Sequence, residues 1–237
     1  MHVDQDIVGA YWLPEVCGVD PQHHLGLLDK VFVHVGGKVI RTEHVTRLVV
    51  EDERVVGVQW PDGSQLAADH VVAATGWSDY SWLPEGNRPR LEAHMGEHMV
   101  LRIREDWPKQ PILVFPGTTS VQRSRNRMWL GVTVRPDDPQ AQLTVGGAIG
   151  ILENAHNLMP GLEHERIIDV GAGIRPVSYD GLPWVGPTDI EGLVLATGHG
   201  RSGILQAPVA AKAVVDCIET GELPQWSQVT NPRGRCV

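Results

Sequence analysis

The residues best suited to chemistry lie in the last third of the sequence, where arginines and glycines are closely spaced. Arg175 lies within Gly173–Pro176, and Arg201 lies within the segment Gly198–Gly203. A guanidinium can bind a carboxylate through two parallel hydrogen bonds and stays charged near neutral pH. Both arginines are therefore candidates for holding an anionic substrate, with Arg175 the first choice. The alternative for each is a solvent-exposed or ion-paired structural arginine.

The elements around Arg201 are predicted to form a strand, a turn and a helix. The short apolar run Leu193–Thr197 is typical of a buried strand, and Ile204–Glu219 has the pattern of a helix. Between them, Gly198, Gly200 and Gly203 form a G-x-G-x-x-G motif. A helix that begins there directs unpaired N–H groups and a partial positive charge at the turn, which suits an anionic ligand group.

The context of this motif argues against ordinary dinucleotide binding. A dinucleotide-binding βαβ unit needs a second parallel strand after the helix, with an acidic residue near its end. Here the predicted helix leads into Thr220–Pro224, and only a short, mostly polar segment follows. We therefore expect the turn to contact something other than the pyrophosphate of a nucleotide held in the usual way.

Several motifs in sequence order resemble those of a known enzyme family. The segments Gly173–Pro176, Asp180–Pro183, Gly186–Pro187 and Ala196–Ile204 are similar to the C-terminal signature of FAD-dependent amine oxidases of the D-amino-acid oxidase superfamily. The resemblance is strongest to the bacterial glycine oxidase branch associated with thiamine biosynthesis, and it covers most of the chain. Members of the family begin with a strand, a glycine-rich turn and a helix that hold the ADP half of FAD. This sequence lacks them, so we expect it to correspond to the later part of such an enzyme.

The resemblance implies a mixed α/β (α+β) fold, in which a partial FAD-binding domain of the glutathione-reductase-like type carries an inserted antiparallel-sheet substrate domain. Residues 19–85 are expected to form the first part of the FAD-binding region, and residues 171–224 its C-terminal part. Residues 86–170, with residues 1–18, are expected to form the substrate region. Residues 225–237 are expected to be a tail.

The family also implies an activity. A small, glycine-like amino acid or amine would be oxidised to the imine by hydride transfer to flavin N5, and O₂ would reoxidise the flavin to give H₂O₂. Arg175 would bind the substrate carboxylate, and Arg201 would face both flavin and substrate. Contact with His199 is expected through its backbone or ring rather than through proton transfer. The residues that the resemblance assigns to FAD are Val45, Thr75, Gly76, Trp77, Gly173, His199, Gly200, Arg201, Ser202, Gly203, Ile204 and Leu205.

Two alternatives to this activity remain open. The chain could be a truncated, catalytically silent or partner-dependent fragment, in which case a complementing N-terminal FAD-binding unit is the expected partner; a homo-oligomer is the other expected assembly. It could instead be a flavin dehydrogenase that uses another electron acceptor. The substrate is also open, because Leu113 lies in the segment Ile112–Pro116, where glycine oxidases carry a substrate-pocket tyrosine.

Two similar segments are expected to lie side by side. Val71–Gly76 and Leu193–Gly198 are both apolar runs that end in Thr-Gly. Such runs suggest neighbouring buried parallel strands, whose carboxyl ends would face a common ligand. Chance similarity of common residues is the alternative.

The pattern between these segments differs. Alternating residues predict antiparallel strands, and Thr144–Leu158 is predicted to be a helix with Thr144 as its N-cap. A short helix is expected over Gln22–Asp29. The remaining predicted strands are Val8–Leu13, Val39–Arg41, Val45–Val50, Val55–Trp60, Gln65–Thr75, Glu97–Arg104, Ile112–Phe115 and Met128–Val134.

Composition narrows the range of partners. The 237 residues include 29 acidic and 20 basic ones, and the formal net charge of −9 argues against nucleic acid and anionic membranes. No apolar run approaches the roughly 18 residues of a membrane span, and residues 1–6 do not resemble a signal peptide. We therefore expect a cytoplasmic protein whose partners are a small amine or amino acid and O₂.

The cysteines and histidines point to neither disulfides nor metal. Cys17, Cys217 and Cys236 are odd in number and far apart, which fits a reducing compartment. Cys217 falls on the apolar face of the last predicted helix and is expected to be packed. Some relatives bind flavin through a cysteine near the arginine motif, but residues 165–190 contain none, so FAD is expected to be non-covalent. The histidines lack metal-ligand spacing, and we expect no metal.

Overall fold

The computed structural model describes residues 7, 9–41 and 44–235. It divides into two compact units, each built from two segments of the chain. The described part of the first unit comprises residues up to Lys38 together with Met95–Ile174. That of the second comprises Val39–His94, without residues 42 and 43, together with Arg175–Arg235. No helix among the described residues is long and apolar enough to cross a membrane.

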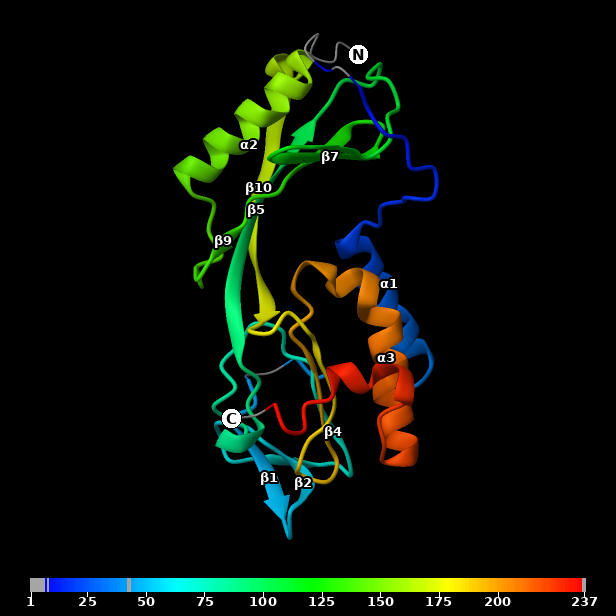
Figure 1. Ribbon diagram of the computed structural model, residues 1–237, viewed down its shortest axis with the longest axis vertical. Coiled ribbons are helices and arrows are strands. Elements are labelled where there is room, and N and C mark those ends of the chain that lie inside the picture. The colour runs from blue at the N-terminus through cyan, green and yellow to red at the C-terminus, as the bar shows by residue number, and fades with distance from the viewer. Residues whose placement is uncertain (1–6, 8, 42–43, 236–237) are drawn as a thin grey trace. The chain divides into compact units, whose positions relative to one another are not determined.

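The first unit is built on an antiparallel sheet in the order β10-β5-β8-β7-β6, with β9 paired to β5. Strands β5 and β10 each continue into the second unit. Helix α2 (Val145–Leu158) lies along one side of this sheet (Figure 1). The strands are β5 (Leu91–Arg102), β6 (Leu113–Phe115), β7 (Thr118–Ser124), β8 (Arg127–Gly131), β9 (Arg135–Pro136) and β10 (Arg166–Ser178).

Alternate side chains of β5 and β8 are buried and form the core beneath α2. Met99 and Leu101 of β5 and Met128 and Leu130 of β8 turn to the same side, as the two-residue period of a strand requires. They pack with Ile151 of α2 in one buried cluster. The same unit contains α1 (Pro21–His34), which has no buried residue and is capped by the side chain of Asp20.

A buried carboxylate fastens the start of α2 to the sheet. Glu97 of β5 is fully buried and accepts hydrogen bonds from the Thr144 N–H at 2.7 Å and the Thr144 hydroxyl at 2.8 Å. Thr133 Oγ1 donates to it at 2.5 Å and Arg135 Nε at 3.1 Å. Burial raises the pKa of Glu97, but the hydrogen bonds outweigh burial and lower the pKa to about 2. Thr144 also caps α2 by accepting from the Gly147 N–H at 2.9 Å.

The second unit holds two small sheets. Strands β1 (Arg47–Glu51), β2 (Arg54–Gln59) and β3 (Gln65–Ala67) form an antiparallel sheet in that order. The other has the order β11-β12-β4, from Trp184–Pro187, Leu193–Thr197 and Val71–Ala73. Helix α3 (Gly203–Thr220) packs on β11 and β12, and the 3₁₀ helix η4 (Gln225–Thr230) packs on β11. This unit also contains the short 3₁₀ turns η1 (Glu85–Asn87) and η3 (Gly200–Ser202), whereas η2 (Pro160–His164) belongs to the first unit.

Most predicted elements are present, and three strand predictions need correction. The described part of Val8–Leu13 and the segment Val39–Arg41 are not strands. The single strand predicted over Gln65–Thr75 is two strands, because β3 pairs with β2 while β4 pairs with β12 in a different sheet. Strand β12 has the predicted bounds, and α2 begins after its predicted cap, Thr144.

We predict that Glu97→Gln lowers the free energy of unfolding by about 2–3 kcal/mol at pH 7, because a buried charged network loses its acceptor. The folded-state pKa of Glu97 lies below its ordinary value. The stabilisation is therefore fully present above about pH 4.5 and is lost as the pH falls towards about 2. Urea unfolding at pH 7 and pH 3 measures both effects, and the difference between wild type and variant should shrink at the lower pH.

The matched control is Glu153→Gln on the exposed part of α2, which should change stability by less than about 0.5 kcal/mol. Equal stability of wild type and Glu97→Gln at pH 7 would show that the network contributes nothing net.

Candidate cofactor and substrate site

Parallel pairing of β4 with β12 brings two glycine turns to the same sheet edge. Val71, Val72 and Ala73 pair with Leu193, Val194 and Leu195 in register. The two strands therefore lead in the same direction into Ala74–Trp77 and into the turn at Gly198. Thr197 Oγ1 donates a hydrogen bond to the Gly76 carbonyl at 3.2 Å, which joins the turns directly. The predicted convergence of these segments is confirmed.

Glycine is required in the second turn for two reasons. Gly198 has φ +76° and Gly200 has φ +54°, a backbone region that L side chains rarely adopt. A Cβ on Gly198 would also lie 3.1 Å from Cδ1 of the buried Trp184. The chain can therefore pass closely over the sheet end only without a side chain.

The start of α3 differs from the starts of the other two α-helices. Side chains of Asp20 and Thr144 cap α1 and α2, whereas no side chain caps α3 at Ser202. The first N–H groups of a helix need a partner from outside the helix. An electron-rich ligand group at this turn would supply one, and the helix dipole would favour it.

Arg175 is connected to this turn through β10 and one β-bridge. It is on β10 two residues before Val177, and Val177 forms an antiparallel bridge with His199. Arg175 Nη1 is buried and has no hydrogen-bond partner, and burial lowers the pKa of the guanidinium. An unpaired buried guanidinium is costly unless an anion meets it. Its surroundings therefore fit a carboxylate ligand.

Arg201 lies in a different environment. It belongs to η3 and is exposed to solvent. We expect Arg201 to lie beside Arg175 in a cleft, and this placement stays a prediction. Ile204 and Leu205, on the first turn of α3, are also exposed. Ser202 and Gly203 are half-buried.

A second hollow of the same unit contains two more of the expected cofactor residues. Val45 and Thr75 both line a cavity of about 560 Å³ beside β4. Gly76 follows with φ +65° and open space where a Cβ would be, and Trp77 is partly exposed. The arrangement leaves room for an extended ligand along the open side of β4. The cavity is lined by His44, Val45, Thr46, Val58, Val71, Val72, Thr75, Ser78, Asp79, Ser81 and Trp82.

Gly173 is the one expected cofactor residue that belongs to the first unit. It lies on β10, and a Cβ there would meet no heavy atom within 4 Å. Leu113, the residue at the family's tyrosine position, packs half-buried against the apolar cluster beneath α2. Cys217 is buried in a cluster with Val185 and Val214, and burial raises the pKa of its thiol. The prediction that it is packed is confirmed.

A polar network in the second unit had no role assigned from the sequence. Asp180 accepts from Ser178 Oγ at 2.7 Å and from Arg235 Nη2 at 2.7 Å. The Arg235 guanidinium also lies 4.4 Å above the ring of Trp184, whose Nε1 donates to Ser178. Burial raises the pKa of Asp180, but these hydrogen bonds lower it overall. The network holds the loop after β10, and only its Asp-Gly-Leu-Pro motif was visible in the sequence.

Comparisons with known proteins agree with this architecture. The profile of the FAD dependent oxidoreductase family, DAO, matches residues 2–217. The chain belongs to this family, and its mixed α/β fold is that of the family. It is 32% identical to the bifunctional protein ThiO/ThiG of Nostoc sp. over 90% of this chain and 32% of that protein. It is 29% identical to the glycine oxidase of Bacillus subtilis over 93% of this chain and 59% of that protein.

Solved structures show the same relationship. Glycine oxidase from Bacillus cereus superposes with a TM-score of 0.72 at 26% identity, covering 84% of this chain and 57% of that one. Glycine oxidase from Geobacillus kaustophilus gives a TM-score of 0.74 at 27% identity, covering 82% and 52%. The chain thus spans a third to three fifths of the length of these relatives.

We predict that Gly198→Ala destabilises the second unit by about 2–4 kcal/mol, because it adds a left-handed backbone penalty to contact with Trp184. The control is Gly221→Ala at the end of α3. That position has φ +77° but open space around a Cβ, so it should cost only about 1 kcal/mol. Urea unfolding compares the two, and equal losses would show that the contact with Trp184 relaxes freely.

Proposed function

We propose that this chain forms the flavin-ring and substrate side of an FAD-dependent oxidase of small amino acids or amines. The observation that carries the proposal is the buried, unpartnered Arg175 Nη1 close to a glycine turn at the start of an uncapped helix. Family membership supplies the cofactor class. When bound, FAD would accept a hydride from the substrate and O₂ would reoxidise it with release of H₂O₂.

The residues of the chain would share the binding of FAD in two groups. N–H groups of Gly200 and Arg201, in η3 just before α3, would meet an electron-rich edge of the cofactor, with helix polarity favouring negative charge there. Val45 and Thr75 would hold a more distant part in their cavity. Cys217 is buried in the core, and residues 165–190 contain no cysteine, so we propose that the cofactor is held without a covalent bond.

Arg175 would bind and orient the substrate. A substrate carboxylate would satisfy its buried Nη1 and fix the rest of the substrate through a bidentate contact. Arg201, which is exposed, would add positive charge at the turn. The relatives named glycine oxidase support a small amino acid, while Leu113 in place of the tyrosine leaves other small amines open.

A partner-dependent role has an observation of its own. Strand β4 lies at the end of the sheet β11-β12-β4, and Val72 on it is partly exposed. A further parallel strand could pair with this edge, as a complementing glycine-rich FAD-binding unit would provide. We include that assembly, or a homo-oligomer, and a cytoplasmic location in the proposal. A dehydrogenase with another electron acceptor is separated from an oxidase by measuring H₂O₂ under air.

We predict that the 237-residue chain alone holds FAD weakly. Its sequence contains no strand, glycine-rich turn and helix of the kind on which the ADP half of FAD rests in this class of fold. Gel filtration with excess FAD should therefore give well under one flavin per chain, and addition of a separately expressed glycine-rich unit from a relative should raise it. Stoichiometric flavin eluting with this chain alone would contradict the prediction.

We predict that Arg175→Lys, in a flavin-complete form, raises KM for a small amino acid by about ten- to hundredfold, with a smaller change in kcat. Lysine keeps the charge but loses the planar fork, a loss of about 1.5–3 kcal/mol. An amine without a carboxylate should show little change. Arg54→Lys is the control, since Arg54 pairs at the surface with Glu191. Unchanged kinetics with Arg175→Lys would assign Arg175 a structural role.

A further inference from the structure

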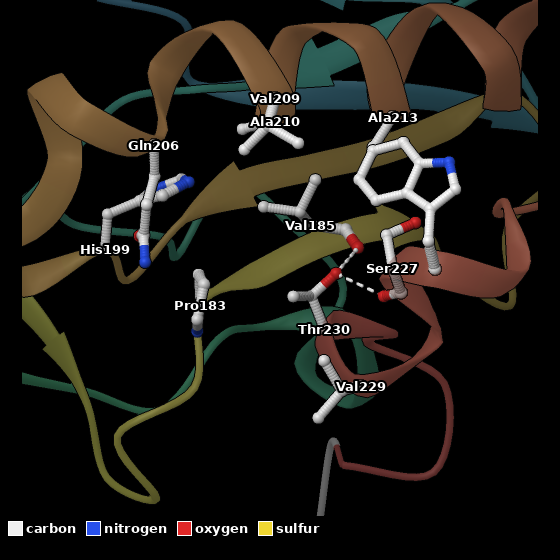
Figure 2. A pocket seen from close by; sticks show the side chains of 11 residues that line it. Pro183, Val185, His199, Gln206, Val209, Ala210, Ala213, Ser227, Val229 and Thr230 are labelled. Carbon is white, nitrogen blue, oxygen red and sulfur yellow. Dashed lines mark hydrogen bonds between the residues drawn. The ribbon is translucent and has the colours of Figure 1, made fainter.

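The second unit contains a small, mostly apolar cavity on the β11 side of α3, which is open to solvent where Val209, Trp226 and Val229 are 48%, 53% and 62% exposed. It has a volume of about 220 Å³ and lies between α3, β11 and η4 (Figure 2). None of its lining residues carries a permanent charge, and neither Arg175 nor Thr75 is among them. The walls are Pro183, Val185, His199, Gln206, Val209, Ala210, Ala213, Trp226, Ser227, Val229 and Thr230.

Two polar atoms in this lining lack a partner. His199 Nε2 and Gln206 Oε1 are both buried without a hydrogen bond. His199 precedes α3 and Gln206 lies near its start, so both belong to the end of the cavity where the helix begins (Figure 2). Burial lowers the pKa of His199, so the ring is neutral at neutral pH. A buried polar group without a partner is unfavourable, so a ligand that supplies a partner is favoured.

The two hydroxyl groups of the lining already have partners. Thr230 Oγ1 lies 2.8 Å from the carbonyl oxygens of Val185 and Ser227. Ser227 Oγ donates to the Pro224 carbonyl at 3.0 Å. Figure 2 shows the two bonds of Thr230 on the far side of the cavity from His199. The buried polar atoms of this lining that lack a partner thus lie at one end of the cavity.

We propose that this cavity binds a small, neutral, phenol-like molecule. An apolar protein cavity of about 150 Å³ can hold benzene, so 220 Å³ accommodates one aromatic ring with a substituent. The ring would contact Val209, Ala210 and Ala213. Its hydroxyl would donate to Gln206 Oε1 and accept from an Nε2–H of His199. A carboxylate or ammonium is disfavoured, because no lining residue offers it a countercharge.

This site is separate from the proposed cofactor contacts but shares the turn at Gly198–Gly203. The side chain of His199 lines the cavity, while its main chain forms the bridge with Val177 and accepts from the Ser202 N–H. An apolar side chain of another protein could fill the same volume, but it would leave Gln206 Oε1 unsatisfied. The proposal does not depend on FAD binding or on turnover.

The test is to titrate the full 237-residue chain with phenol and with toluene. Binding is measured from the changes in the ¹⁵N-resolved NMR shifts of residues in α3 and η4. Phenol should bind saturably. Gln206→Leu removes the acceptor at similar side-chain volume. It should lower the affinity for phenol by about tenfold without lowering the affinity for toluene. Ala210→Leu should weaken both by filling the cavity. Ala207→Leu, at an exposed position outside the lining, should weaken neither.

Several results would overturn the proposal. One is the absence of a saturable phenol shift up to ~10 mM, which corresponds to binding weaker than about 3 kcal/mol. Another is an equal loss of affinity for phenol and for toluene in Gln206→Leu. Circular dichroism and urea unfolding show whether each variant is folded, and an FAD titration of the same variants keeps the two binding sites distinguishable.

Discussion

The candidate site depends on the parallel pairing of β4 with β12. Parallel neighbours end at the same edge of a sheet, so this pairing determines that two turns far apart in sequence meet. The Thr197 hydroxyl closes the join by bonding to Gly76. On the other side, β11 pairs antiparallel with β12 and places Trp184 directly under Gly198. The turn is thus held from both flanks, and its glycines are needed because the space above the sheet end is already filled.

Some buried polar groups of this chain are satisfied within the fold and others are not. In the first unit, Glu97 receives every bond it needs from Thr133, Thr144 and Arg135, so its charge serves to attach α2. In the second unit, Arg175 and His199 each keep a buried nitrogen without a partner. A fold tolerates few such atoms, since each costs on the order of 1–3 kcal/mol. Such atoms occur in both units, but Arg175, His199 and Gln206 lie at or near one glycine turn of the second unit, which is the physical reason to look for ligands there.

The sequence was sufficient to predict the elements whose local pattern and pairing agree. Strand β12 and the capped helix α2 are of this kind, and so is the meeting of the two Thr-Gly turns. Gln65–Thr75 was predicted wrongly because its halves join different sheets, and no local pattern reports that. The segment Val39–Arg41 has the residue types of a strand, yet no strand is assigned to it in the part of the chain that the structure describes. Local propensity decides little where pairing is absent.

Within the site, the sequence predicted which main-chain turns converge but not which side-chain atoms stay unpaired. The type and position of Arg175 made it a candidate, yet its buried and partnerless Nη1 is a property of the packed fold. The role of Arg235 was invisible for the same reason. Arg235, at the end of the described residues, contacts both Asp180 and Trp184. Arg235 and the Asp180 carboxylate are 55 positions apart in the sequence.

The segment after α3 therefore has a structural role. Through Arg235 it fixes the loop that follows β10, and through Trp226, Val229 and Thr230 it forms one wall of the small cavity. The opposite wall is α3. Its first turn contributes Gln206 to the lining of the cavity, and the residues just before the helix form the proposed cofactor turn. Since His199 contributes its ring to one side and its main chain to the Val177 bridge on the other, any shift of the turn must alter both environments. Two binding functions proposed for this unit thus share one turn, in which a Cβ on Gly198 would press against Trp184.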